Sequence, residues 1–309
     1  MLALHLGAGS ELTLFLPALA LAGLVIGYIA GMFGVGGGFM LVPMLIYLFG
    51  VPVDIAVGSA ICQQCGTSLA AFLKYRSLKR GEPRIDLIMI GGSLAGVDAG
   101  VRLMAHISKL AAWHGSGGHS VPAARGILDI CFFILLTITA AYTIKDARAA
   151  SKRLVPRGDL TIPGPLVTRV RIPPFIDLPG VQLKQVSVPM IALTGFALGT
   201  ASGMLGLGGG VLLVPVLMYG FGISLRNAAG TGVLLLFVTV AAGTAEYTLQ
   251  GRVNLPLALS ILMGSSIGAQ LGALTTNRLP NRKLRIIFAA LIVFTAAMVS
   301  WDLIRLLRS

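Results

Sequence analysis

The sequence predicts an all-α integral membrane protein made of two inverted-topology repeats. Three observations lead to this prediction: the scarcity of charged residues, a gap-free internal repeat, and glycine runs that interrupt very long hydrophobic stretches. Each repeat is expected to contain a glycine-broken helical hairpin followed by three transmembrane helices, which makes about eight membrane segments.

The composition places the chain in a membrane. Of its 309 residues, 56% are hydrophobic and 11% are charged, whereas a soluble domain usually has about 25% charged residues. The charges cluster and leave apolar runs of about 18 residues or more, the length of a membrane-spanning helix. The net charge of +13 is attributed to Lys and Arg in cytoplasmic loops, which orient membrane proteins. No nucleic-acid partner is therefore expected.

An internal repeat divides the chain into two halves. Residues 31–60 read GMFGVGGGFMLVPMLIYLFGVPVDIAVGSA, and residues 203–232 read GMLGLGGGVLLVPVLMYGFGISLRNAAGTG. At a constant offset of 172, 15 of the 30 positions are identical, which shared membrane composition alone would not produce. The chain is thus expected to comprise a first membrane repeat at 1–144, a Pro-rich cytoplasmic connector at 145–186 and a second membrane repeat at 187–309.

Length requires each half to begin with a broken helix. As one helix, residues 14–49 would be roughly 54 Å long at about 1.5 Å per residue, whereas the bilayer core is about 30 Å thick. The run Gly34–Gly38 is the expected turn, because glycine enters turns without a Cβ clash, and Gly206–Gly210 repeats it. The later spans are expected at Val57–Leu73, Ile85–Met104 and Ile127–Ile144, and at Ala228–Leu249, Leu255–Thr276 and Ile286–Leu303.

Three spans after each returning hairpin give the two halves opposite orientations. If Lys74–Arg84 lies on the cytoplasmic side, 18 of the 24 Lys and Arg residues do so as well, in agreement with the positive-inside rule. A multi-pass protein of the cytoplasmic (inner) membrane is expected.

The two glycine turns are the expected substrate site. Broken helices in matching positions of inverted repeats point to a transporter's midplane site. Helices that start at the turns present free N–H groups and a positive dipole end, and both attract anions. For Gln63 and Gln64, bonding across helices is favoured over contact with the substrate, and both are kept as candidates. The expected substrate-binding residues are Gly36, Gly37, Gly38, Phe39, Gly208, Gly209, Gly210, Val211, Gln63, Gln64 and Thr231.

An ionisable residue inside a membrane span is a functional hypothesis by default. Asp98, and Gln270 at the equivalent position of the other half, are therefore the coupling-ion candidates. A hydrogen bond to a neighbouring helix is the open alternative for Asp98. A proton or sodium gradient is the expected driver, because the sequence has no Walker-type phosphate-binding motif. No His cluster, nucleophile elbow or paired carboxylates occur, so no cofactor, metal site or enzymatic activity is expected.

The doubled glycine motif resembles that of a known family. G-M-F-G-V-G-G-G-x-x-L-V-P and G-M-L-G-L-G-G-G-x-x-L-V-P are similar to the paired signature of the sulfite exporter TauE/SafE family. The resemblance implies an eight-segment transporter that moves sulfite, an organosulfonate or a related sulfur-containing anion out of the cytoplasm. It also places the family's hairpin glycines on Gly36–Gly38 and Gly208–Gly210.

Secondary active export of a small sulfur-containing anion is therefore the expected function. An anion channel would fit the same site and stays an alternative. A metal carrier is a second alternative, because Cys62 and Cys65 form a C-x-x-C on a helix, although no His or acidic partner lies near them in the sequence. The expected partners are the anionic substrate, the coupling ion and membrane lipids, and a homodimer remains open.

Overall fold

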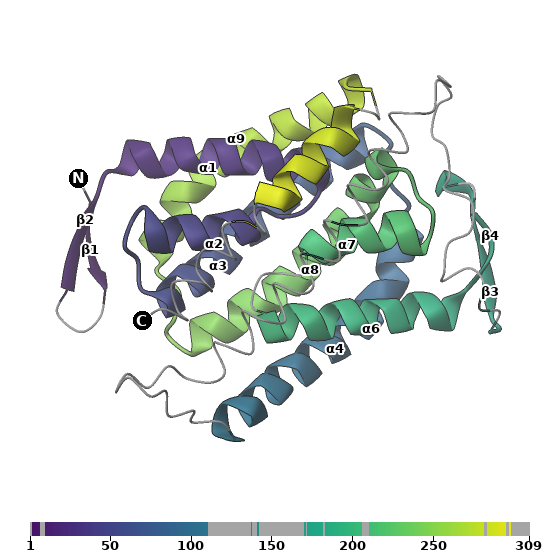
Figure 1. The fold of residues 1–309 in the computed structure, drawn as a ribbon, viewed down its shortest axis with the longest axis horizontal. Coiled ribbons are helices and arrows are strands. Elements are labelled where there is room, and N and C mark those ends of the chain that lie inside the picture. The colour runs from purple at the N-terminus through teal and green to yellow at the C-terminus, as the bar shows by residue number, and fades with distance from the viewer. Residues whose placement is uncertain are drawn as a thin grey trace.

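Long helices make up most of the structure, a computed structural model (Figure 1). The structure describes residues 2–6, 10–110, 172–181, 183–205, 210–280 and 283–294, together with positions 137, 141, 170 and 297. Within these residues, four helical segments are long and apolar enough to cross a membrane: Leu16–Phe33, Ile55–Ser77, Leu225–Leu249 and Leu255–Arg278. The expectation of a mostly helical protein with several apolar spans is thus confirmed.

The internal repeat reappears in the helix boundaries. The first half contains α1 (Leu16–Phe33), α2 (Gly38–Tyr47), α3 (Val53–Ser77) and α4 (Pro83–Leu110). The second half contains α6 (Val188–Leu205), α7 (Gly210–Pro215), α8 (Leu225–Leu249) and α9 (Leu255–Arg278). Each of these helices begins 172 residues after its counterpart. The halves differ after the shared proline, because α7 gives way to the π-helical η3 (Val216–Gly220) whereas α2 continues beyond Pro43.

The predicted spans agree with the described helices. Val57–Leu73, Ile85–Met104, Ala228–Leu249 and Leu255–Thr276 lie within α3, α4, α8 and α9. The span predicted from Ile286 begins inside a helical run at 283–294, and the span predicted at Ile127–Ile144 lies outside the described residues apart from positions 137 and 141.

Helices from different halves pack side by side through glycine faces. α1 lies along α9, and α4 lies along α6 (Figure 1). A Cβ on Gly27 would lie 2.2 Å from the carbonyl oxygen of Ser265, and a Cβ on Gly199 would lie 2.2 Å from that of Ser93. These contacts are equivalent at the repeat offset, and small residues allow membrane helices to approach this closely.

The same contacts give the relative directions of the helices. Gly23, Gly27 and Gly31 of α1 face Ile261, Ser265 and Ala269 of α9 in that order, so these two helices are parallel. α3 runs the same way, because the Tyr75 hydroxyl near its end donates to the carbonyl of Gly31 near the end of α1, at 2.8 Å.

α4 and α6 form a second pair of parallel helices. Gly195, Gly199 and Gly203 of α6 face Met89, Ser93 and Val97 of α4 in that order. α8 runs antiparallel to α3, because Ile61 lies against Gly243 at one end of the pair while Tyr75 clusters with Ala229 at the other. The equivalent helices α3 and α8 therefore point in opposite directions.

Two β-hairpins were not expected in an all-α protein. β1 (Leu2–Leu6) pairs antiparallel with β2 (Ser10–Leu14), and β3 (Phe175–Leu178) pairs antiparallel with β4 (Leu183–Ser187). The second hairpin lies at the end of the predicted linker 145–186. It is held in place because Leu178, Val181 and Val186 are buried in the main hydrophobic cluster with Ile85 of α4.

Candidate functional site

The first glycine turn reverses the chain between α1 and α2. Gly34, Gly36 and Gly37 have φ values of 68°, 81° and 78°, a region that glycine enters without the steric cost met by other residues. Among the described residues, the main-chain amides of Gly36, Gly37, Gly38 and Phe39 have no backbone acceptor. Unbonded amides of this kind at a helix start attract negative charge.

The carboxamide of Gln64 lies directly on this turn. A Cβ on Gly38 would come within 1.6 Å of Gln64 Nε2, and one on Gly36 would lie 2.9 Å from Gln64 Oε1. Gln64 is fully buried, and neither polar atom of its side chain has a hydrogen-bond partner among the described residues. Since buried polar groups are nearly always hydrogen-bonded, this unpaired carboxamide marks the turn as a place for a polar ligand.

Gln63, the neighbouring residue, has a different role. Its Nε2 donates to the hydroxyl oxygens of Thr67 on α3 and Ser265 on α9, and these two hydroxyls lie 2.8 Å apart. Gln63 therefore bonds across helices, the role favoured for both glutamines, whereas Gln64 does not. The sequence interpretation missed Ser265, although its equivalence to Ser93 at the repeat offset was a usable signal.

The start of α7 touches the first turn. A Cβ on Gly210 would lie 1.9 Å from the carbonyl oxygen of Val35, so main chain from the two glycine segments is in direct contact. Phe39 is buried beside this contact. Gly208, Gly209 and the side chain of Val211 lie outside the described residues.

A narrow crevice borders the first turn and the polar face of α3. It is lined by Gly31, Gly34 and Gly36 on one side and by Thr67, Ser68 and Leu236 among the residues opposite. Its empty space totals about 170 Å³ but leaves no room for a water molecule. In this conformation the turn is therefore closed to solvent on that side.

The hydroxyl of Thr231 bonds to main chain outside the glycine turn. It accepts a hydrogen bond from the Glu82 amide at 3.0 Å, at the start of α4. The equivalent Ser59 hydroxyl accepts from the Asn254 amide at 3.0 Å, at the start of α9. The pair thus holds the two helix starts, and the hydroxyl of Thr231 is not directed to the glycine turn.

The two coupling-ion candidates do not line the crevice at the turn. Asp98 is exposed on α4 and pairs with Arg102 on the same helix, at 3.0 Å. Gln270 is exposed on α9 and lines a groove with Lys74. The hydrogen bond to a neighbouring helix that was considered for Asp98 is replaced by a bond within its own helix.

Asp86 is the buried carboxyl that the sequence interpretation overlooked. It lies in the first turn of α4, is 2% exposed, and its Oδ1 has no hydrogen-bond partner among the described residues. Glu82 is buried close by. The signal was available, because Asp86 falls within the predicted span Ile85–Met104 and intramembrane carboxyls are functional hypotheses.

Cys62 and Cys65 are half-buried free thiols on α3. In the described part of the chain, no group of three His, Cys, Asp or Glu side chains is placed to hold a metal ion. The structure therefore adds no support for the metal-carrier alternative.

Comparison with known proteins identifies the family. The family model of the sulfite exporter TauE/SafE proteins matches residues 19–299. The chain belongs to the TauE/SafE family. A similar protein of Bacillus subtilis, the probable membrane transporter protein YunE, is 24% identical over 292 residues, which cover 92% of this chain and 97% of that protein.

Other relatives extend the comparison. A probable membrane transporter protein of Haemophilus influenzae is 26% identical over 302 residues, covering 91% of this chain and 97% of its own length. The probable membrane transporter protein MamO of Magnetospirillum gryphiswaldense is 37% identical over 107 residues, which are 32% of this chain and 17% of MamO. No solved structure matches the chain significantly. As a member of the TauE/SafE family, the protein is a multi-pass membrane transporter.

Proposed function

We propose that this TauE/SafE protein is a secondary active transporter that exports a small sulfur-containing anion, sulfite or an organosulfonate, across the cytoplasmic membrane. The observation that carries the proposal is the unpaired, buried carboxamide of Gln64 on the first glycine turn. The amide group of Gln64 and the turn's main-chain N–H groups are donors, and the oxygens of such an anion are acceptors. Backbone and amide dipoles can hold the anion without a buried cation.

We place this site at the midplane of an eight-segment inverted repeat. The opposite directions of the equivalent helices α3 and α8 support this architecture. The contact between Gly210 and the Val35 carbonyl supports two hairpins whose tips meet. Gly208, Gly209 and Val211 belong to the proposed site through the repeat, as the counterparts of Gly36, Gly37 and Phe39.

An anion channel stays the alternative, because a closed channel and an occluded transporter would both leave no room for water beside the turn. Alternating access, in which one half moves against the other around the site, opens such a space to each side in turn. A proton or sodium gradient is the proposed driver. Asp98 and Gln270 remain candidates for the coupling ion, and Asp86 joins them because it is buried.

The test compares the wild type with Gln64→Glu in proteoliposomes loaded with sulfite. Glutamate keeps the size of the side chain but replaces its donors with a negative charge, so gradient-driven flux and the thermal stabilisation by sulfite should both be lost. Gln250→Glu is the matched control, because Gln250 is exposed at the end of α8. Wild-type flux through Gln64→Glu would overturn the site. Sulfite flux that follows only its own concentration gradient, without a response to an imposed proton or sodium gradient, would favour the channel.

A further inference from the structure

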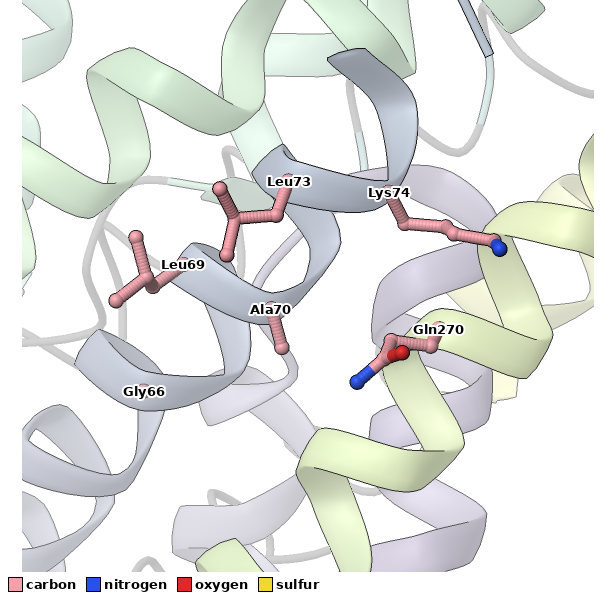
Figure 2. Close-up of a pocket in the computed structure, with 6 residues that line it drawn as sticks. All are labelled: Gly66, Leu69, Ala70, Leu73, Lys74 and Gln270. Atoms are coloured by element: carbon pink, nitrogen blue, oxygen red, sulfur yellow. The ribbon is translucent and has the colours of Figure 1, made fainter. Parts of the chain in front are cut away.

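A groove between α3 and α9 opens on the surface of the helix bundle. Its volume is about 350 Å³, within the range of about 300–1,000 Å³ that is typical of small-molecule pockets. Figure 2 shows the six residues that line it. They are Gly66, Leu69, Ala70, Leu73, Lys74 and Gln270.

The walls of the groove are apolar and continue onto an apolar outer surface. Leu69 and Leu73 are 39% and 59% exposed on α3, and Ile267 and Leu271 are similarly exposed on α9. In a multi-pass membrane protein, such a surface faces lipid acyl chains. Gly66 and Ala70 form a shallow floor because their side chains are small. The groove therefore suits an alkyl chain lying along α3.

One end of the groove is polar and positively charged. In Figure 2 Lys74 of α3 and Gln270 of α9 lie at the same end of the groove, and their polar ends point in different directions. Among the described residues, no carboxylate lies within ion-pair distance of Lys74. Arg76 and Arg278 occupy the last turns of the same two helices. An anionic group is the complementary ligand for this end.

The positive charge at this end of the groove is not repeated at the equivalent positions of the other half. At the offset of 172, the residues equivalent to Lys74 and Gln270 are Glu246 and Asp98. The corresponding positions of the other half are thus acidic and would repel an anion. Of these two equivalent places, the groove beside the basic run Lys74–Arg84 is the one that combines an apolar wall with an unpaired cation among the described residues, and basic pockets at the membrane surface bind anionic lipid headgroups.

We infer that the groove binds an anionic phospholipid. One acyl chain lies along Leu69 and Leu73, and the headgroup phosphate pairs with the Lys74 ammonium at the polar end of the groove. The lipid belongs to the leaflet on the side of Lys74–Arg84. This inference does not depend on which anion the protein transports.

Thermal unfolding of the purified protein in detergent tests the inference. Phosphatidylglycerol should raise the unfolding midpoint of the wild type by about 3 °C or more, because a ligand of the folded state stabilises it, and phosphatidylcholine should not. Lys74→Gln should lose most of this shift, and Lys74→Arg should keep it. Lys79→Gln is the matched control, because Lys79 is an exposed lysine in the same basic run that does not line the groove.

Three results would overturn the inference. They are equal shifts in Lys74→Gln and Lys79→Gln, an equal shift with phosphatidylcholine, and an equal shift with soluble glycerol phosphate, which would indicate a free-anion site. A second measurement uses the wild type alone, so it does not depend on how a variant folds. A photoreactive phosphatidylglycerol should crosslink to residues 66–74 or 263–271, and crosslinks confined to other segments would contradict the groove.

Discussion

Gly38→Ala isolates the contribution of Gln64 to anion binding. Gly38 begins α2 and does not have a positive φ, so alanine introduces no backbone strain there. The new methyl group would lie 1.6 Å from Gln64 Nε2, less than half of an ordinary van der Waals separation. The end of a flexible side chain must yield, so the carboxamide leaves the turn.

The magnitude follows from the hydrogen bonds that are lost. A hydrogen bond to a charged group contributes about 1.5–3 kcal/mol. Losing one such bond weakens anion binding by roughly 10- to 150-fold, because about 1.4 kcal/mol corresponds to a factor of ten. Losing two bonds would remove measurable binding at millimolar sulfite.

Sulfite binding by titration calorimetry and sulfite counterflow in proteoliposomes provide the assay. Gly91→Ala is the matched control, because a Cβ on Gly91 meets nothing within 4 Å. The double variant Gly38→Ala/Gln64→Ala should bind no more weakly than Gln64→Ala, since both changes remove the same donor. Wild-type affinity in Gly38→Ala, or losses that simply add in the double variant, would refute the reasoning.

Three further perturbations test other parts of the structure. Gly37→Val should abolish sulfite flux while leaving membrane insertion intact, because φ is 78° there and a Cβ would lie 2.8 Å from Ile26 Cγ2; wild-type flux would remove the turn from the site. Asp86→Asn should leave sulfite binding unchanged but remove the response of flux to an imposed proton gradient, and a persisting response would exclude Asp86 as the proton carrier. Gly27→Val should lower the thermal unfolding midpoint, because overpacking costs about 1–3 kcal/mol and its Cβ would lie 2.2 Å from the Ser265 carbonyl oxygen; an unchanged midpoint would show that α1 and α9 tolerate separation.

The helices and the breaks between them could be predicted because they follow from local and repeated features. The repeat copies each helix start at one offset, and the glycine runs occur where a single helix would exceed the bilayer thickness. The conformation of Gly34, Gly36 and Gly37 follows from the same argument, since only glycine takes those φ values readily.

It could not be predicted in this way which polar side chains face the glycine turn and which form hydrogen bonds between helices. Gln63 and Gln64 are adjacent and chemically identical, but they point about 100° apart around α3. Which of them faces the turn depends on the rotation of α3 against α9, and tertiary packing sets that rotation. The partner of the Thr231 hydroxyl, the amide of Glu82, could not be predicted for a similar reason. The β3–β4 hairpin was missed because its short strands lie in a proline-rich segment.

The pairing of α1 with α9 has a consequence for biosynthesis. A ribosome delivers α1 to the membrane long before α9 exists, so the glycine face around Gly27 has no native partner during most of translation. α4 likewise has no packing partner until α6 of the following half has been synthesised. Neither half can complete its own packing alone, and assembly finishes only when the late helices arrive. Chains interrupted after the first half should therefore be recognised by membrane quality control as unfinished, even though every one of their helices is already inserted.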